Sequence, residues 1–341
     1  MPETLDVIIV GAGPTGLACG IEAVRAGLKT LIVEKGCLVN SLFTYPANMT
    51  FFTSRELLEI GDLPLPSTNV KPTRAEALEY YRRVAEYFHL PIHYQERVNG
   101  IQRATLANHQ ATGTGFEIET ETSDGKMHIH RARQAIIATG YYDLPNYLGI
   151  PGEGLPKVSH YAREGHEYFG RKVVVIGGAN SAAVTSLDLY RHGAEVTLVY
   201  RGRELSRHIK YWIRPDLENR IKANAIRAYL ESRVTEITHD SISIQTSAGE
   251  TVRIENDFVF ALTGYHPDVD LLRGAGIQVD PESFRPSLNP ETLESNVAGL
   301  YVAGVVVSGL QTNEIFIENG RFHGKLIIAD IKRKINTSTI E

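Results

Sequence analysis

Residues 5–36 constrain the fold more than any other part of the chain. An apolar run leads into Gly11, Gly13 and Gly16, and a helical pattern and a second apolar run follow up to Glu34. Glycines at this spacing let a turn approach a pyrophosphate and let the helix pack on its strand, while an acid at the end of the second strand accepts hydrogen bonds from ribose hydroxyls. The segment therefore predicts a dinucleotide site in a strand–helix–strand unit.

A second copy of this pattern follows after a shift of 166 residues, which places Glu34 on Tyr200. Where the first copy has its acid, the second continues into Arg201 and Arg203. An acid repels a 2′-phosphate, whereas arginine side chains bind one, so the first unit predicts FAD and the second NADPH. The alternative is that the two arginines only solvate a strand end. The residues predicted to contact NADPH are Gly177, Ala179, Asn180, Ser181, Ala182, Arg201 and Arg203.

Length and charge limit the remaining possibilities. The chain has 341 residues, more than one hydrophobic core usually supports, so we expect two domains. Its net charge of -5 and its lack of a basic run argue against nucleic acid as a partner. No apolar run approaches the roughly 18 residues that span a bilayer, and the first strand begins too early for a signal peptide. We therefore expect a cytoplasmic protein that does not enter a membrane.

Neither the cysteines nor the histidines are spaced as metal ligands. Cys19 and Cys37 cannot form a CxxC pair or a zinc cluster. His89 and His93 are separated by a proline, and the pair at 128 and 130 suits an exposed strand face. The sequence predicts no metal site.

The segments around the repeats predict a discontinuous first domain. Thr73 and Glu76 have the spacing of a capping box at the start of a helix, and Ala-Thr-Gly at 138–140 follows an apolar strand. The segment 241–255 predicts a β-hairpin. A late apolar strand and a helix from about Asn313 would complete the first sheet. We predict an α/β protein with two Rossmann-like domains, in which an NADPH domain (152–263) is inserted into a FAD domain (1–151 and 264–341).

Longer motifs resemble known flavoproteins over nearly the whole chain. VGAGPTG, ATGY, GGANSA and a late AG before a helix resemble the low-molecular-weight thioredoxin reductase fold, but the CxxC of those enzymes is absent. EKGCLVNSLFTYPANMTFF, ATGYYDLPN, IPGEGLPKVSHY and NEIFIENGRFHG resemble the bacillithiol disulfide reductase (YpdA) family. This resemblance implies hydride transfer from NADPH to FAD, reduction of a low-molecular-weight disulfide, and a homo-oligomer. The predicted FAD contacts are Gly11, Gly13, Pro14, Thr15, Gly16, Glu34, Lys35, Asn40, Val98, Thr139, Gly140, Gly304, Glu314 and Ile315.

One departure from the resembling family concerns the electron acceptor. Many members with bacillithiol carry a cysteine where this chain has Thr15, and threonine forms no mixed disulfide. Catalytic residues are therefore not assigned from the sequence, and Cys37 is either a substitute thiol or a small loop residue. Three alternatives stay open beside disulfide reduction. They are electron transfer to ferredoxin or flavodoxin, flavin-dependent monooxygenation, and a flavin-binding sensor without enzymatic activity.

Overall fold

The computed structural model describes residues 4–108 and 111–338, and the chain forms two compact units. Unit 1 comprises Met1–Thr44, Met49–Leu144 and Tyr265–Glu341, and unit 2 comprises Tyr45–Asn48 and Pro145–Gly264. The second unit is thus inserted into the first, with divisions at 144/145 and 264/265 where the sequence led us to place them at 151/152 and 263/264. A short piece of the loop after the first repeat also belongs to unit 2.

Unit 1 is built on a sheet of seven strands among the described residues. Six of them are paired in the order β3-β2-β1-β6-β5-β4, and the seventh, β15, pairs with β6. Strands β1, β2, β3, β6 and β15 are parallel, whereas β4, β5 and β6 form an antiparallel meander. The strands are β1 (Leu5–Val10), β2 (Thr30–Val33), β3 (Ile92–His93), β4 (Glu96–Asn108), β5 (Ala111–Thr122), β6 (Met127–Ile137) and β15 (Leu300–Val302).

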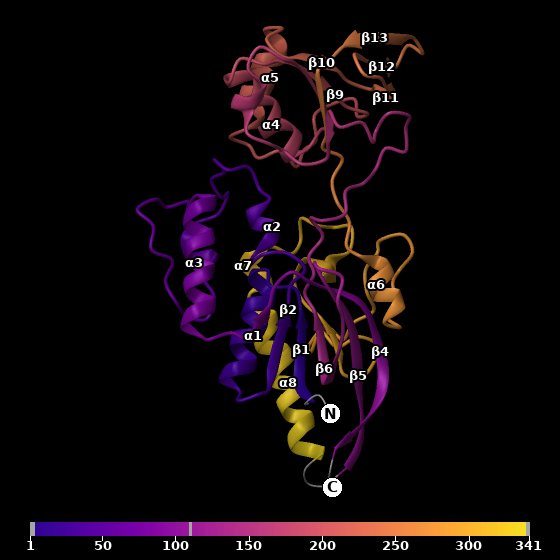
Figure 1. The fold of residues 1–341 in the computed structure, drawn as a ribbon. Coiled ribbons are helices and arrows are strands. Elements are labelled where there is room, and N and C mark those ends of the chain that lie inside the picture. Colours follow the sequence, from indigo (N-terminus) through magenta and orange to yellow (C-terminus); the bar gives the residue numbers. More distant parts are fainter. Residues whose placement is uncertain (1–3, 109–110, 339–341) are drawn as a thin grey trace. The chain divides into compact units, whose positions relative to one another are not determined.

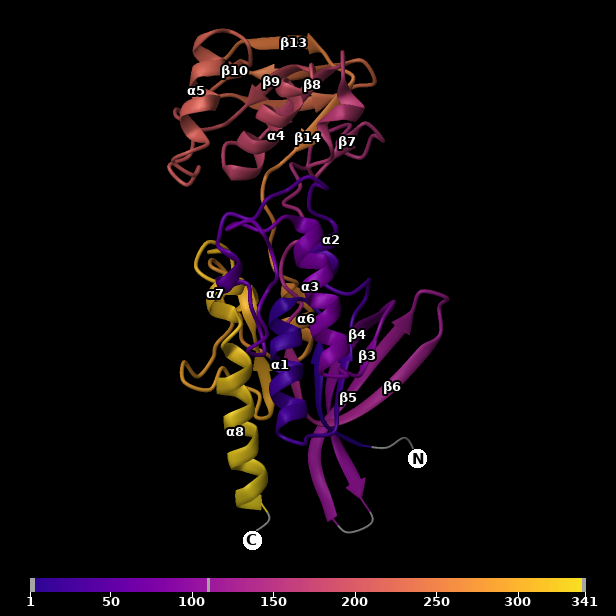
Figure 2. The ribbon, with the colours of Figure 1, turned by 90° about the vertical axis from the view of Figure 1, so that its left-hand side faces the viewer.

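Helices α1 and α8 lie side by side along this sheet in both views (Figures 1 and 2). Helix α3 begins as predicted, because the Thr73 hydroxyl accepts from the Glu76 amide while the Glu76 carboxylate accepts from the Thr73 amide. The helices of unit 1 are α1 (Pro14–Arg25), α2 (Asn40–Phe43), η1 (Arg55–Leu57), α3 (Arg74–Tyr87), α6 (Val269–Gly274), η3 (Gly304–Ser308), α7 (Ile317–Gly320) and α8 (His323–Ser338).

Unit 2 repeats the parallel strand–helix–strand plan on a smaller scale. Its parallel sheet has the order β10-β9-β8-β14-β7, and a separate antiparallel sheet has the order β11-β12-β13. The second of these contains the hairpin that the sequence predicts. The elements are β7 (Val158–Ser159), η2 (Gly165–Tyr168), β8 (Lys172–Ile176), α4 (Asn180–Arg191), β9 (Glu195–Val199), α5 (Arg214–Lys222), β10 (Arg227–Tyr229), β11 (Arg233–Ile237), β12 (Ser241–Gln245), β13 (Thr251–Glu255) and β14 (Phe258–Ala261).

The two repeats match element for element, and the fold is an α/β fold with two Rossmann-like units. The 166-residue shift carries α1 (Pro14–Arg25) onto α4 (Asn180–Arg191). The prediction of a helix from about Asn313 is wrong, because the chain turns there and α7 begins only at Ile317. Within residues 4–108 and 111–338, no helix is long and apolar enough to cross a membrane.

Candidate nucleotide-binding sites

The turn of the first repeat has room only for glycine at two positions. Gly11 has a φ of 106°, and a Cβ there would lie 2.6 Å from the carbonyl oxygen of Ala138. A Cβ on Gly16 would lie 2.0 Å from the carbonyl oxygen of Gly11. These close approaches hold the start of α1 against the end of β1 and bring the predicted 138–140 turn beside the motif. The N-cap of α1 is Gly13, which has no side chain to occupy the first-turn amides, so they remain suited to a phosphate.

Glu34 is buried, and its carboxylate is aimed at the same turn. Its Oε2 accepts from the amide of Ala12 at 2.7 Å and its Oε1 accepts from the amide of Gly36 at 2.9 Å. Burial raises the pKa of this carboxyl, whereas the two amide bonds act in the opposite direction. Each carboxylate oxygen keeps a second acceptor site, which fits ribose hydroxyls. The Asn40 side chain lies against Gly36 and accepts from the Cys37 amide, so this predicted residue belongs to the same loop.

Thr15 faces the C-terminal part of unit 1. Built Cβ positions on Gly304 and Gly320 would lie 3.2 Å and 3.0 Å from its hydroxyl oxygen, so both glycines pack closely on Thr15. The amide of Gly304 donates to Nδ1 of buried His323 at 3.0 Å. Burial lowers the pKa of His323, and this acceptor role places the proton of the neutral ring on Nε2.

Prediction from the sequence missed Gly320 as a neighbour of Thr15 and His323 as the acceptor of the Gly304 amide. Their signal was present in the segment Asn-Gly-Arg-Phe-His-Gly, where a glycine and a histidine stand at the junction of α7 and α8. Because the prediction placed the helix start several residues too early, these two residues were assigned to its interior.

Of the other predicted FAD contacts, some lie beside the glycine turn of the first repeat and others are held by partners elsewhere in unit 1. Thr139 lies beside this turn, with its Cα 3.3 Å from a Cβ built on Gly11, and Gly140 has a φ of 73°. Lys35 forms an ion pair with Asp143 at 2.9 Å. Glu314 instead holds Arg285 through both carboxylate oxygens at 2.6 Å, in an exposed ion pair. Pro14 is the first residue of α1, Val98 lies in β4, and Ile315 packs near the Gly320 position.

The second repeat has the same turn with a different strand end. A Cβ on Gly177 would lie 2.5 Å from the carbonyl oxygen of Leu262, so the residue directly after β14 covers this turn as the 138–140 segment covers the first. The ring of Tyr200 packs on Gly178 and Gly202. The N-cap of α4 is Ala179, whose side chain cannot cap the helix. Among the other predicted NADPH contacts, Ser181 and Ala182 lie in the first turn of α4, and Asn180 binds the backbone of His208 and Lys210.

Arg201 and Arg203 follow this strand end as the sequence predicts. Both side chains are exposed, and neither makes a hydrogen bond or an ion pair with the described residues. Two guanidinium groups directly after this strand end supply charged donors of the kind that bind a 2′-phosphate. The donors of unit 2 thus fit a phosphorylated nucleotide, whereas the buried acid of unit 1 fits free ribose hydroxyls.

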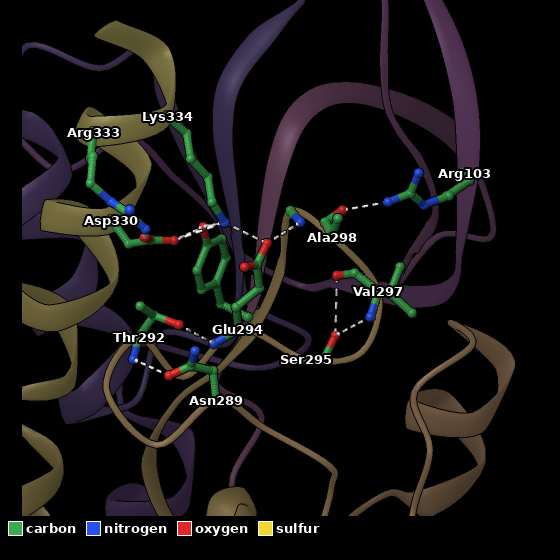
Figure 3. A network of polar contacts seen from close by, with 12 residues as sticks. Arg103, Asn289, Thr292, Glu294, Ser295, Val297, Ala298, Asp330, Arg333 and Lys334 are labelled. Atoms are coloured by element: carbon green, nitrogen blue, oxygen red, sulfur yellow. Dashed lines mark hydrogen bonds and ion pairs between the residues drawn. The ribbon is translucent and has the colours of Figure 1, made fainter. Parts of the chain in front are cut away.

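A buried polar network anchors α8 of unit 1 to the core of its sheet (Figure 3). The Tyr301 hydroxyl of β15 donates to Asp330 at 2.8 Å, and Lys334 contacts Asp330 at 2.8 Å and Glu294 at 2.6 Å. Asp330 also accepts from Arg333. Burial by itself would raise the pKa of Asp330, but hydrogen bonds from Arg333, Lys334 and Tyr301 lower it to about 2. The network fixes the helix whose first turn carries His323.

This combination of fold and sites defines the class. The chain belongs to the pyridine nucleotide-disulphide oxidoreductase family, whose model matches residues 8–304. It is therefore an oxidoreductase, and the family identifies its cofactors as FAD and a nicotinamide nucleotide. The chain is 45% identical over 329 residues to the bacilliredoxin reductase Bdr of Bacillus subtilis strain 168, covering 96% of this chain and 98% of that protein.

Two solved structures are similarly close. The bacillithiol disulfide reductase Bdr (YpdA) from Bacillus cereus superposes with a TM-score of 0.92 at 44% identity. The match covers 97% of this chain and 100% of that protein. The protein of the same description from Staphylococcus aureus gives 0.89 at 41% identity, covering 97% of this chain and 99% of that one. The resemblance inferred from the sequence is confirmed, and electron transfer to ferredoxin and monooxygenation are not favoured.

Proposed function

We propose that this protein is a flavin-dependent, NADPH-consuming reductase of a low-molecular-weight disulfide of the bacillithiol type. The observation that carries this proposal is a match over nearly the whole chain, at 41–45% identity and with the same fold, to the Bdr proteins of two Bacillus species and one Staphylococcus species. Because one of these relatives is described as a bacilliredoxin reductase, a bacilliredoxin is the second candidate acceptor. In the bacterial cytoplasm the protein would act as a homo-oligomer.

The residues of unit 1 would hold FAD. The first-turn amides of α1 would bind the pyrophosphate, and Glu34 would bind the ribose through the free acceptor sites of its carboxylate. The 138–140 turn and Gly304 bring backbone close to the turn after β1, where a cofactor can pass without meeting side chains. His323 holds Gly304 in place and keeps a proton on Nε2. When bound, FAD supplies the chemistry that accepts a hydride and releases electrons to an acceptor.

The residues of unit 2 would hold NADPH. Arg201 and Arg203 would bind the 2′-phosphate, the Tyr200 ring would offer a flat apolar surface, and the α4 amides would bind the pyrophosphate. The overall reaction balances when one NADPH, one proton and one disulfide give NADP⁺ and two thiols, with the hydride supplying both electrons that break the S–S bond.

Thr15 would distinguish this chain from a reductase that carries a cysteine at the start of α1. Its side chain lies at the start of α1, against Gly304 and Gly320, where a cysteine would have a lowered pKa. Without a sulfur there, no mixed disulfide with substrate forms at this position. The disulfide would therefore be reduced without a protein thiol at position 15.

An anaerobic acceptor experiment tests the proposal. The protein is reduced with one equivalent of NADPH and then mixed with bacillithiol disulfide, an oxidised bacilliredoxin, or an oxidised ferredoxin, while the flavin absorbance is followed. We expect reoxidation by bacillithiol disulfide and none by the ferredoxin. Reoxidation by the bacilliredoxin alone would identify the protein disulfide of bacilliredoxin as the substrate. Reoxidation by the ferredoxin alone would contradict the proposal.

A further inference from the structure

Two histidines and a buried glutamate from three strands of unit 1 converge beside the strand end that carries Glu34. His93 ends β3, Glu96 begins β4, and His130 lies in β6. Nδ1 of His93 lies 2.9 Å from Oε2 of Glu96, and Nε2 of His130 lies 2.6 Å from Oε1 of Glu96. One ligand atom from each residue lies within 4.8 Å of the other two. We call these three residues the His93–Glu96–His130 cluster.

The sequence offers no sign of this cluster, because its members are drawn from different strands. The predicted absence of metal ligands rested on histidines that are neighbours in sequence, namely the pairs at 89 and 93 and at 128 and 130. In the sheet, β3 and β6 lie on opposite sides of β2 and β1, and the chain brings β4 back beside the end of β2. Topology rather than spacing therefore assembles the three side chains.

The exposure, ionisation and orientation of the three side chains suit the binding of a metal ion. Its carboxylate side chain is only 5% exposed, whereas His130 is 17% and His93 is 52% exposed. Hydrogen bonds from Thr120, His130 and His93 outweigh the effect of burial and lower the pKa of Glu96, so the carboxylate is ionised at neutral pH. The Thr120 hydroxyl donates to Oε1, which orients the carboxylate in the way that outer partners orient metal ligands.

From this geometry we infer that the His93–Glu96–His130 cluster is a binding site for a divalent metal ion of the zinc class. Two imidazole nitrogens and one carboxylate oxygen are ligands that suit Zn²⁺, and two imidazoles disfavour Mg²⁺ and Ca²⁺. Tetrahedral bonds of about 2.1 Å separate ligand atoms by about 3.4 Å, so the histidines need to withdraw from Glu96 by less than about 1 Å. The half-exposed ring of His93 can make this movement, and it leaves a fourth position open to water.

Binding there would also affect the neighbouring FAD site, a consequence that rests on the proposed place of FAD in unit 1. The Glu34 amide donates to the carbonyl of His93 at 2.8 Å, and the Glu34 carbonyl accepts from the Glu96 amide at 3.0 Å. The peptide of Glu34 is thus held between two of the metal ligands. An ion that joins His93 to Glu96 would fix the backbone of the residue that binds ribose.

Calorimetric titration of the flavin-loaded protein with ZnCl₂ tests the site. We expect one ion per chain, and binding at least about 10–100-fold weaker after His93→Gln or His130→Gln. Loss of a residue that only hydrogen-bonds a metal ligand already weakens binding by this factor, so loss of a ligand itself should cost at least as much. His93→Gln changes a half-exposed side chain and should fold normally. His128→Gln, on the same strand as His130, and His239→Gln, an exposed histidine of unit 2, are matched controls that should bind as the native protein does.

X-ray absorption at the zinc edge identifies the ligands in the same samples. We expect nitrogen and oxygen scatterers without sulfur, and Cys37→Ser should leave binding intact. Unchanged affinity in both ligand variants, equal losses in the two controls, or a sulfur ligand would each overturn the inference. Because zinc is titrated without NADPH or a disulfide, the result does not depend on the proposed reaction. The coupling to FAD is measured separately, as the flavin retained after dialysis with and without zinc.

Discussion

The two repeats share one backbone plan and differ where their second strands end. In the first, the Glu34 carboxylate accepts from the amide of Ala12. In the second, the ring of Tyr200 packs on Gly178, which occupies the position equivalent to Ala12. The same place beside the turn therefore carries a buried polar anchor in one unit and an aromatic surface followed by arginines in the other. The proposed division of FAD and NADPH between the repeats therefore depends on the strand end rather than on the glycine turn.

The largest expected effect comes from removing the polar anchor of the first repeat. Glu34→Gln replaces an acceptor of two amide donors by a group with only one acceptor oxygen, and a buried unsatisfied donor costs about 1–3 kcal/mol. We expect FAD affinity to fall by about 10–100-fold, measured by titrating the apoprotein and following flavin fluorescence. Glu119→Gln, an exposed acid on β5, is the control. Native affinity in Glu34→Gln would refute the anchoring role.

An effect of comparable size is expected from the arginines of the second repeat. Replacing Arg201 and Arg203 by alanine removes charge-assisted bonds worth about 1.5–3 kcal/mol, so 2′,5′-ADP should bind more than about tenfold more weakly. The binding of 5′-AMP should hardly change, because it lacks the 2′-phosphate. Arg233→Ala, on β11 of the same unit, is the control. Equal losses for both ligands would mean that the arginines do not recognise the 2′-phosphate.

Thr15 allows the first repeat to be changed without touching its anchor. Thr15→Cys places a thiol at the start of α1, and we expect a several-fold rise in turnover of bacillithiol disulfide with no change in flavin reduction by NADPH. Thr15→Ser keeps a hydroxyl and should show no rise. Turnover in the cysteine variant that stays at the native value would show that a thiol here is not what limits the reaction.

A further prediction concerns the polar network that joins β15 and α8 of unit 1. The pKa of Asp330 is lowered from 3.8 to about 2, so its bonds stabilise the fold fully above pH 3.8, and that contribution is lost as pH falls toward 2. Asp330→Asn should cost about 1–3 kcal/mol at neutral pH, and the difference from the native protein should shrink over this interval.

Hydrogen exchange can show whether this loss is local. Faster exchange in β15 and α8 of Asp330→Asn, with β8 and β14 unchanged, is the expected result. Asp270→Asn, an exposed residue of α6, should leave both regions as they are. Equal destabilisation of both units would contradict a network that anchors only unit 1.

The parts of the fold that depend on local pattern could be predicted. Glycine spacing and apolar periodicity placed both repeats, the capping-box spacing placed the Thr73 helix start, and residue alternation placed the hairpin in unit 2, because each depends on neighbouring residues. Gly304 was predicted as an FAD contact, but the packing of Gly304 and Gly320 on Thr15 could not be predicted, because these glycines come from the far end of the chain. Glu314 was expected near FAD from its place in a motif, but its side chain is engaged by Arg285.

The division of cofactors between the repeats is tested most directly by anaerobic rapid mixing of the flavin-loaded protein with NADPH or NADH at equal concentrations below saturation. Bleaching of the flavin absorbance reports hydride transfer in each case. We predict that NADPH bleaches it faster by at least about tenfold, the value of one charge-assisted bond of about 1.5 kcal/mol. Equal rates with the two nucleotides, or no bleaching by either, would contradict the assignment of NADPH to the second repeat.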